Sequence, residues 1–354
     1  MSNASTHIGI IKHLIVGLMF TLPLLSASHL KVLHKVVLNV TLDLEGPSGG
    51  SYIDPPVYVY ESYEGNKIII PSDVFFEVFT LTGEKIARIG GRGEGPGNFR
   101  FLLYMEKHNG YYYFLDSPNK LNVYDGDFSF KKRILLQGPR NALYAYSFAF
   151  FEDNILVGQK WTGDSPHTDR CISVYGLDGK LLRAFFNKNH GWKLYPEESL
   201  LHPVILTTHG EIFFAFNSIP ILWKLNNAGS IVNKAALGKT WWKKIEFNAK
   251  EFNKKRRMNA WKAINELALS GDLIQKLWSW RGHIVVQVVR DAYDDPRNLF
   301  FIIDRNFKKA GNLIDYPGYQ FCGAGTFIYL GKLLDMNKSN RKKVVEVLQC
   351  DYVF

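Results

Sequence analysis

The sequence predicts an all-β fold, a β-propeller with six blades, from three observations. Aromatic residues make up 14% of the chain, and they favour strands because their side chains pack well on a pleated, half-buried surface. A unit of strand, tight turn and strand recurs, as in FFEVFTLTGEKIARI, CISVYGLDGKLLRAF and ILWKLNNAGSIVNKAAL. A further strand precedes each unit, for example GYYYFLD and GEIFFAF. Four-stranded meanders that recur every 40 to 50 residues or so are typical of propeller blades.

The N-terminal segment has the pattern of a secretory signal. Lys12 and His13 precede an apolar run over residues 14–25, and small residues follow at 26–28. The run is short for a membrane span, so we expect residues 1–28 to direct export to the periplasm, the cell surface or the medium. An uncleaved N-terminal anchor and a buried strand are the alternatives. No cysteine follows the run, and a lipid-anchored lipoprotein is therefore not expected.

Six units are found, at residues 50–95, 96–137, 140–187, 200–238, 272–315 and 318–352. Their turns carry Gly83, Gly126, Gly179 and Gly229, which supply the positive φ angles that tight hairpins need. The last unit has only three strands, and KVLHKVVLNVTLDL before the first unit is a strand without a partner. We expect this N-terminal strand to complete the last blade, which leaves no open edge where the ring closes. Residues 29–354 then form one propeller, with a β-sandwich as the structural alternative.

The glycine-rich stretch GGRGEGPGNF, residues 90–99, connects the first unit to the second. Its glycines do not have the GxGxxG spacing of a dinucleotide site, and no long helix follows to bind a phosphate at its N-terminus. We therefore expect a tight crossing between blades. A role for Arg92 or Glu94 in ligand binding is the alternative.

IGGRGEGPGNF, followed by YYYFLDSPNKLNVYD, resembles the NHL-type repeat. More closely, the two motifs resemble those of exported six-bladed β-propeller proteins of the NHL-like or TolB-like kind. The resemblance is good over residues 58–135 and weaker towards residue 235. It implies an exported six-bladed propeller. It implies no particular activity, since most of that family has none assigned, and the lipid-attachment cysteine that the family often carries is absent.

A basic insertion, at about residues 240–271, separates the fourth unit from the fifth. Met258, Trp261, Ile264 and Leu267 recur at three-residue steps, which predicts one or two amphipathic helices. Between residues 239 and 262 the basic residues are Lys239, Lys243, Lys244, Lys250, Lys254, Lys255, Arg256, Arg257 and Lys262, against Glu246 and Glu251. We expect a helix packed on the propeller edge with its charges in water. Peripheral contact with an anionic membrane is one alternative. A nucleic-acid arm is another, and export disfavours it.

The ligand site is expected on one face of the ring. In a propeller, the crossings between blades and the turns between second and third strands share this face. It gathers aromatic and charged residues, namely Arg92, Glu94, Arg140, Trp161, Asp164, His167, Asp169, His190, Trp192, Asp291, Tyr293 and Arg297. Rings beside Arg and Asp suit a sugar or a peptide, because rings stack and polar groups fix orientation. We predict a monomeric, non-catalytic recognition protein of the cell envelope that binds a glycan, a peptide or a protein partner. Solvated loops without a ligand are the alternative for each residue.

An enzyme is the competing class, as a metal-dependent hydrolase or lyase that acts on lactones or peptides. It would hold calcium or zinc in the channel, whereas the recognition protein needs no cofactor. The six histidines after residue 50 are His108, His167, His190, His202, His209 and His283, without an HxH or HExxH motif. Asp294 and Asp295 are adjacent acids that lack further spaced ligands. Cys171, Cys322 and Cys350 have no metal-ligand spacing, and Cys322 and Cys350 are either bridged or buried as thiols.

Overall fold

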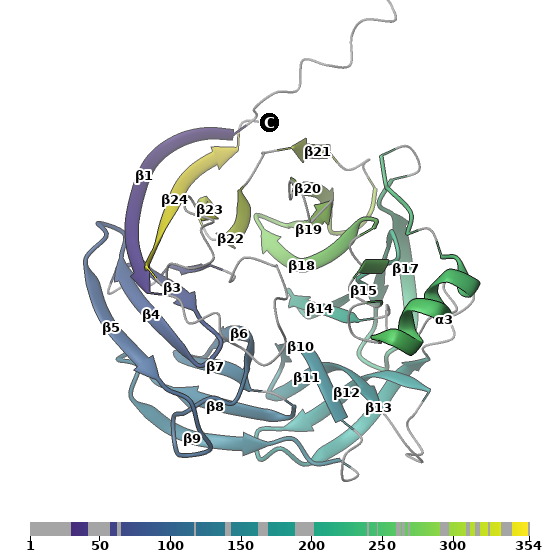
Figure 1. Ribbon diagram of the computed structural model, residues 1–354, viewed down its shortest axis with the longest axis horizontal. Helices are drawn as coiled ribbons and strands as arrows, with labels where there is room; N and C mark the ends of the chain where they lie inside the picture. The colour runs from purple at the N-terminus through teal and green to yellow at the C-terminus, as the bar shows by residue number, and fades with distance from the viewer. Residues whose placement is uncertain are drawn as a thin grey trace, which may run out of the picture.

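Six four-stranded antiparallel sheets are arranged in a ring in the computed structural model (Figure 1), and we call the region between their inner strands the channel. This confirms the predicted six-bladed propeller. The structure describes residues 30–41, 57–61, 65–116, 118–138, 143–161, 169–187, 202–238, 241–245, 247–259, 263, 266–267, 270–290, 297–308, 312–315, 319–324, 326–333 and 342–352. The signal-like segment 1–28 lies outside the described residues.

Each blade follows the chain from its inner strand to its outer strand. Blade 1 contains β2 (Tyr58–Tyr60), β3 (Lys67–Pro71), β4 (Phe75–Thr80) and β5 (Lys85–Gly90), and blade 2 contains β6 (Leu102–His108), β7 (Tyr111–Asp116), β8 (Lys120–Tyr124) and β9 (Phe130–Leu135). Blade 3 contains β10 (Leu143–Phe151), β11 (Asn154–Trp161), β12 (Arg170–Gly176) and β13 (Leu181–Asn187), and blade 4 contains β14 (Pro203–Thr208), β15 (Glu211–Phe216), β16 (Ile221–Leu225) and β17 (Ile231–Ala236). Blade 5 contains β18 (Leu273–Trp280), β19 (His283–Arg290), β20 (Arg297–Asp304) and β21 (Asn312–Asp315).

Blade 6 is built from both ends of the chain. It contains β22 (Gln320–Ala324), β23 (Ile328–Leu333) and β24 (Lys342–Tyr352), and β1 (Leu30–Thr41) is its outer strand. β1 pairs antiparallel with β24, from Leu30 opposite Tyr352 to Thr41 opposite Lys342, and Figure 1 shows the two strands side by side. The expected closure of the ring by the N-terminal strand is therefore confirmed.

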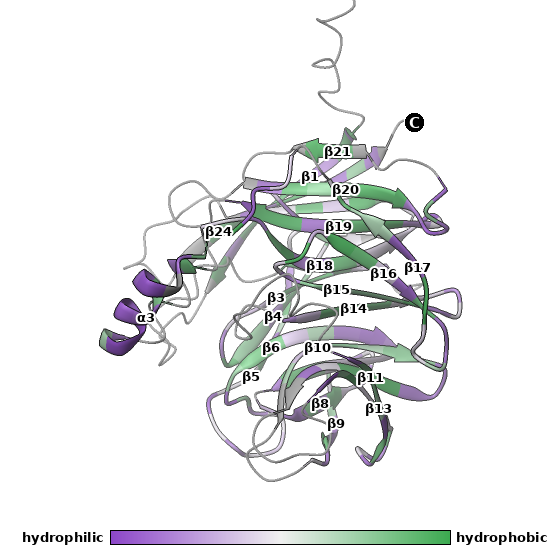
Figure 2. Cartoon of the chain, turned by 90° about the vertical axis from the view of Figure 1, so that its right-hand side faces the viewer, coloured by the Kyte–Doolittle hydropathy of each residue, from purple (hydrophilic) through white to green (hydrophobic). Residues whose placement is uncertain are grey.

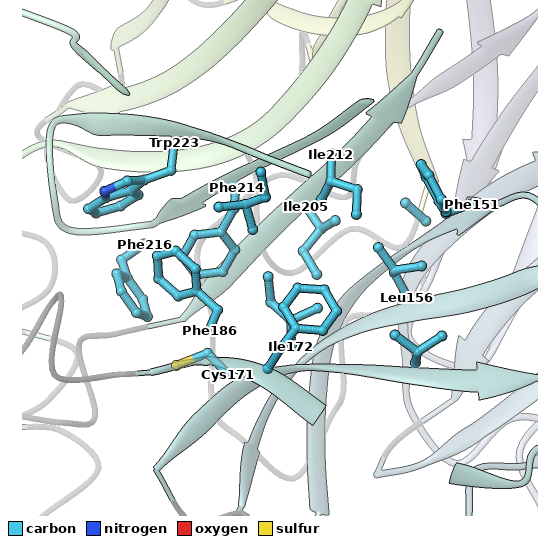
Figure 3. Packing of buried hydrophobic residues seen from close by; sticks show 14 of the residues in the cluster. Phe151, Leu156, Cys171, Ile172, Phe186, Ile205, Ile212, Phe214, Phe216 and Trp223 are labelled. Carbon is cyan, nitrogen blue, oxygen red and sulfur yellow. The ribbon is translucent and has the colours of Figure 1, made fainter. Parts of the chain in front are cut away.

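The core lies between neighbouring blades, so both faces of most strands are buried. Ile68, Ile69 and Ile70 of β3 are all fully buried, which explains why the second strand of a blade can be a continuous apolar run. Between blades 3 and 4, the ring of Phe186 lies 4.4 Å from that of Phe214 (Figure 3). Figure 2 shows the hydrophobic residues concentrated in the sheets, while helix α3 is mostly hydrophilic.

The turns between third and fourth strands set the distance between blades. Gly83, Gly179 and Gly229 have φ angles of +83° to +90° in these turns. A Cβ atom at Gly179 would lie 2.2 Å from the carbonyl oxygen of Leu135, in the outer strand of the preceding blade. At Gly229 it would lie 2.2 Å from the Phe185 ring. Glycine is needed here for its left-handed conformation and for close contact.

The prediction that Gly126 fills this role in blade 2 is wrong. Phe128 takes the left-handed position, with φ +60°, and its N–H donates to the Asp125 carbonyl at 3.0 Å. Phe307, with φ +59°, occupies the equivalent position in blade 5. Each ring reaches the preceding blade, with Phe128 lying 5.9 Å from Phe76 and Phe307 lying 6.0 Å from Phe213. Aromatic contact thus replaces backbone contact, which offsets the strain of the left-handed conformation.

The basic insertion contains helix α3 (Ala249–Met258). Asn248 caps its N-terminus, since the Asn248 side chain accepts from the backbone N–H groups of Lys250 at 3.1 Å and Glu251 at 3.2 Å. Met258 ends the helix and is 82% exposed, so it does not pack on the propeller as the apolar pattern predicts. Of the other residues in that pattern, Leu267 packs against the core between blades 3 and 4, and Trp261 and Ile264 lie outside the described residues.

A buried ion pair anchors the insertion to blade 5. Asp272 is fully buried and accepts from Arg290 Nε at 2.8 Å, from Arg290 Nη2 at 2.7 Å and from the Lys243 N–H at 2.8 Å. Arg290 also donates to the Trp241 carbonyl. Every charged atom of Asp272 therefore has a hydrogen-bond partner.

The three cysteines are buried and form no disulfide with one another, which settles the alternative for Cys322 and Cys350 in this structure. Burial raises the pKa of Cys350 to about 11. Among the described residues, no helix is both long and apolar enough to cross a membrane.

We expect Gly229→Ala to destabilise the protein more than Gly110→Ala. Both glycines have φ near +80°, so both substitutions incur the left-handed strain of about 1 kcal/mol. Only Gly229 contacts a neighbouring side chain, because nothing lies within 4 Å of a Cβ atom at Gly110. Displacing Phe185 adds about 1 to 3 kcal/mol, which urea unfolding measures. Equal losses for the two variants would contradict the role assigned to close blade contact.

Candidate ligand-binding site

Few of the predicted site residues have described side chains. Arg140, Asp164, His167, His190, Trp192, Asp291 and Tyr293 lie outside the described residues. Trp161 ends β11 and Arg297 begins β20, so both flank turns between second and third strands, as expected, but their side chains are not described. Arg92, Glu94 and Asp169 can be placed.

Arg92 and Glu94 belong to a crossing that is held in place by hydrogen bonds. The Arg133 guanidinium donates to the carbonyl oxygens of Glu94, Gly95 and Asn98 at 2.7, 2.9 and 2.9 Å. The Glu94 carboxylate forms an exposed ion pair with Lys120, and this hydrogen bond lowers the pKa of Glu94. The glycine-rich stretch joins β5 to β6 and is therefore the expected crossing between blades. Its carbonyl groups accept hydrogen bonds from Arg133, which hold the crossing in place.

Asp169 lies beside a cavity between blades 3 and 4. Its carboxylate accepts from Asn187 Nδ2 at 3.2 Å and lies 3.4 Å from Arg170 Nε. Asn187 and Arg170 line the cavity, which has a volume of about 420 Å³ and is completed by Phe185, Phe186 and residues 228–231. This is the one predicted site residue whose surroundings include a described cavity.

A second cluster, which sequence analysis missed, lies in the central channel. Lys276 of β18 in blade 5 points across the channel to β2 and β6 of blades 1 and 2. Its Nζ lies 3.6 Å from Glu106 Oε1. It also lies 4.1, 4.3 and 4.2 Å from the ring centroids of Tyr58, Tyr104 and Trp278, which is cation–π distance. We call Lys276, Glu106, Tyr58, Tyr60, Tyr104 and Trp278 the channel cluster.

Burial perturbs both charged groups of the channel cluster. It lowers the pKa of Lys276 to about 8, and the charge of Glu106 opposes part of this shift. Burial also raises the pKa of Glu106, which the charge of Lys276 opposes. Both pKa shifts favour the neutral form of the group. The attraction between the two charges does not compensate for the hydration free energy that each ion loses on burial. Titratable groups perturbed in this way are frequent at functional sites.

The channel cluster also contains polar atoms without a partner. The Nζ of Lys276 and the hydroxyls of Tyr60 and Tyr104 are buried and have no hydrogen-bond partner among the described residues. Most buried polar atoms in folded proteins do have one, so three together call for a water or a ligand. The Glu106 side chain keeps 27% of its surface exposed, which leaves the cluster in contact with the channel.

Neighbouring residues fix the geometry of the channel cluster. Gln287 accepts from Trp278 Nε1 at 3.3 Å and donates to Gln275 Oε1 at 2.6 Å. The register of β18 shifts between Ile274 and Lys276, and a bulge of this kind re-aims the side chains that follow it. The cluster combines donors, one acceptor and aromatic walls, a combination suited to binding. The described residues contain no group of three His, Cys, Asp or Glu side chains close enough to hold a metal ion.

The sequence does contain a signal for the channel cluster. A lysine stands in the mostly apolar and aromatic strand LIQKLWSW, at the start of the fifth unit. A glutamate stands in LLYMEKH at the start of blade 2. Charged residues in the inner strands of a propeller face the channel or a neighbouring blade, and each one is therefore a candidate site residue.

No protein-family model and no curated protein matches this sequence. Solved structures do match, among them the "Putative exported protein" of Bacteroides fragilis NCTC 9343, at 14% identity and a TM-score of 0.57 over 92% of this chain and 96% of that chain. A protein of unknown function from Bacteroides caccae has 10% identity and a TM-score of 0.47 over 73% of this chain and 81% of that chain. Streptogramin B lyase has 11% identity and a TM-score of 0.48 over 89% of this chain and 98% of that chain. The similarity to the Bacteroides fragilis protein supports the propeller fold and carries no function.

Wild-type stability should rise with pH relative to the variant Lys276→Met/Glu106→Gln. The pKa of Lys276 is about 8 in the folded protein, against about 10.4 for an unfolded lysine. The unfolded chain therefore binds more protons between these values, and stability increases with pH in this window. Urea unfolding should show a relative gain of about 2 kcal/mol from pH 8 to pH 10. Parallel pH profiles would mean that Lys276 titrates normally.

Proposed function

We propose that this protein is a non-catalytic recognition propeller of the cell envelope. It binds a glycan, a peptide or a protein partner through the face that carries the crossings, with the channel cluster at its centre. The observation that carries this proposal is the meeting of Lys276 and Glu106 among aromatic rings, beside polar atoms that lack partners.

A ligand rich in hydroxyl groups fits the channel cluster best. A hydroxyl can donate to the Glu106 carboxylate and accept from Lys276 or from a tyrosine hydroxyl. The Trp278 ring, which is only partly buried, offers an apolar surface against which a sugar ring can pack. Such a ligand would supply hydrogen bonds to the buried polar atoms that have none among the described residues. A glycan is therefore the preferred ligand.

The proposed location in the envelope has two supports. Residues 1–28 have the pattern of a secretory signal, and the Bacteroides fragilis protein of the same fold is described as exported. The motifs shared with NHL-like and TolB-like propellers agree with this assignment. The proposal includes a monomer that works without a cofactor.

We expect Lys276→Met/Glu106→Gln to weaken binding of the best ligand from a glycan and peptide screen by about ten- to a hundredfold. Hydrogen bonds to charged groups contribute about 1.5 to 3 kcal/mol each. The matched control is Lys131→Met/Asp125→Asn, which removes an exposed ion pair with a 2.7 Å contact at the blade 2 hairpin. Isothermal titration calorimetry measures both variants against the full wild-type chain.

Unchanged affinity of the channel variant would exclude the channel cluster as the site. The loop face is tested in the same assay by Trp161→Ala and Arg297→Ala, which should also lose affinity. Calcium or zinc that purifies with the protein, together with hydrolysis or elimination that stops on chelation, would replace recognition by the metal-dependent hydrolase or lyase.

A further inference from the structure

Helix α3 carries a row of cations that no structural role explains. Lys250, Lys254 and Arg257 are exposed and form no ion pair with a described residue. Their spacing of four and three residues places them on one side of the helix, over about 10 Å. Lys255, by contrast, pairs with Glu251 at 3.0 Å and Glu266 at 3.4 Å. We call Lys250, Lys254 and Arg257 the α3 row.

Two features of the α3 row oppose the helix, although Arg257 lies in the last turn, where a cation is favoured. Lys250 lies in the first turn, where the partial positive charge of the helix N-terminus disfavours a cation. The three side chains also repel one another at these spacings. A partner of opposite charge would remove both costs.

The apolar side of α3 is already occupied. Phe252 is 5% exposed, and its ring lies 5.4 Å from that of Phe247. Met258 is the one described large apolar side chain of α3 that faces water. A helix that enters a lipid interface needs a continuous exposed apolar face. The surface therefore fits a polyanion in solution better than a bilayer.

The location of α3 connects the row to the channel. The helix belongs to the crossing between β17 and β18, and all crossings between blades share one face of a propeller. Figure 2 shows α3 standing out from the body of the sheets. Figure 1 shows α3 at the outer edge of the ring, so a ligand that contacts both the helix and the channel must extend from the centre of this face to its rim.

We propose that the ligand is an acidic polysaccharide whose carboxylates bind the α3 row while its hydroxyls reach the channel cluster. This inference rests on the proposed function. The Glu106 carboxylate disfavours a second negative charge in the channel, so the anionic groups lie at the rim and the neutral hydroxyls inside. Exposed cations also attract such a chain over about a Debye length and speed its association.

The test is binding of polygalacturonate and of neutral dextran by the full chain. Lys250→Glu/Lys254→Glu/Arg257→Glu should weaken polygalacturonate binding at least about tenfold at low salt, and the difference should shrink at 1 M salt. The matched control, Lys31→Glu/Lys180→Glu/Lys308→Glu, makes the same charge change at exposed lysines of blades 6, 3 and 5 and should lose much less. The glutamine version of the α3 variant replaces the glutamate version if circular dichroism shows misfolding.

Equal losses in the α3 variant and its control would overturn the proposal, as would dextran binding as tight as that of polygalacturonate. Phosphatidylglycerol vesicles or DNA, if bound more tightly through the α3 row than polygalacturonate, would assign the row to a membrane or to nucleic acid and also overturn it. Loss of binding in Lys276→Met/Glu106→Gln, with the α3 variant unaffected, would leave the proposed function standing without this inference. The reverse result would exclude the channel cluster as the site and leave the α3 row as an independent anion site.

Discussion

The close approach of each blade to its neighbour is the constraint on which the rest of the structure depends. One left-handed turn residue per hairpin contributes to it, either as a glycine that allows close contact or as a phenylalanine whose ring contacts the preceding blade. Because this spacing is kept around the ring, strands from blades that are not neighbours face each other across the channel. Lys276 in blade 5 reaches Glu106 in blade 2 for this reason.

Two buried ion pairs in this protein differ in how far hydrogen bonds compensate the desolvation of their charges. The carboxylate of Asp272 accepts three hydrogen bonds at 2.7 to 2.8 Å, so its desolvation is compensated and it fastens the insertion to blade 5. Lys276 and Glu106 are 3.6 Å apart, and the lysine Nζ has no hydrogen bond among the described residues. The desolvation of the second pair is not compensated by hydrogen bonds in this way, and this is the physical reason for placing the proposed ligand at the channel cluster.

Local patterns were sufficient to predict the architecture from the sequence. Turn glycines such as Gly83 and apolar strands such as β3 are set by neighbours along the chain, so the blades, their order and the closing strand could be predicted. The presence of Phe128 where a turn glycine is expected could not be predicted from the sequence. The strain of its left-handed conformation is offset by contact with a ring in the preceding blade. Lys276 and Glu106 are far apart in sequence and meet only when the ring forms. Most predicted loop residues lie outside the described part of the chain, so their role stays a prediction.

The pairing of β1 with β24 also governs the order in which the protein can assemble. Leu30 pairs with Tyr352, which lies almost the whole length of the chain later, so the last sheet is complete only when both strands are present. Contacts so distant in sequence close slowly, because loop-closure entropy must be overcome first. Until then β1 presents an unpaired edge together with Val32, Leu33 and Val37, which are partly exposed even in the finished ring. β1 therefore stays open to pairing with other chains until β24 is available, and the order of assembly bears on how much of the protein reaches the folded state.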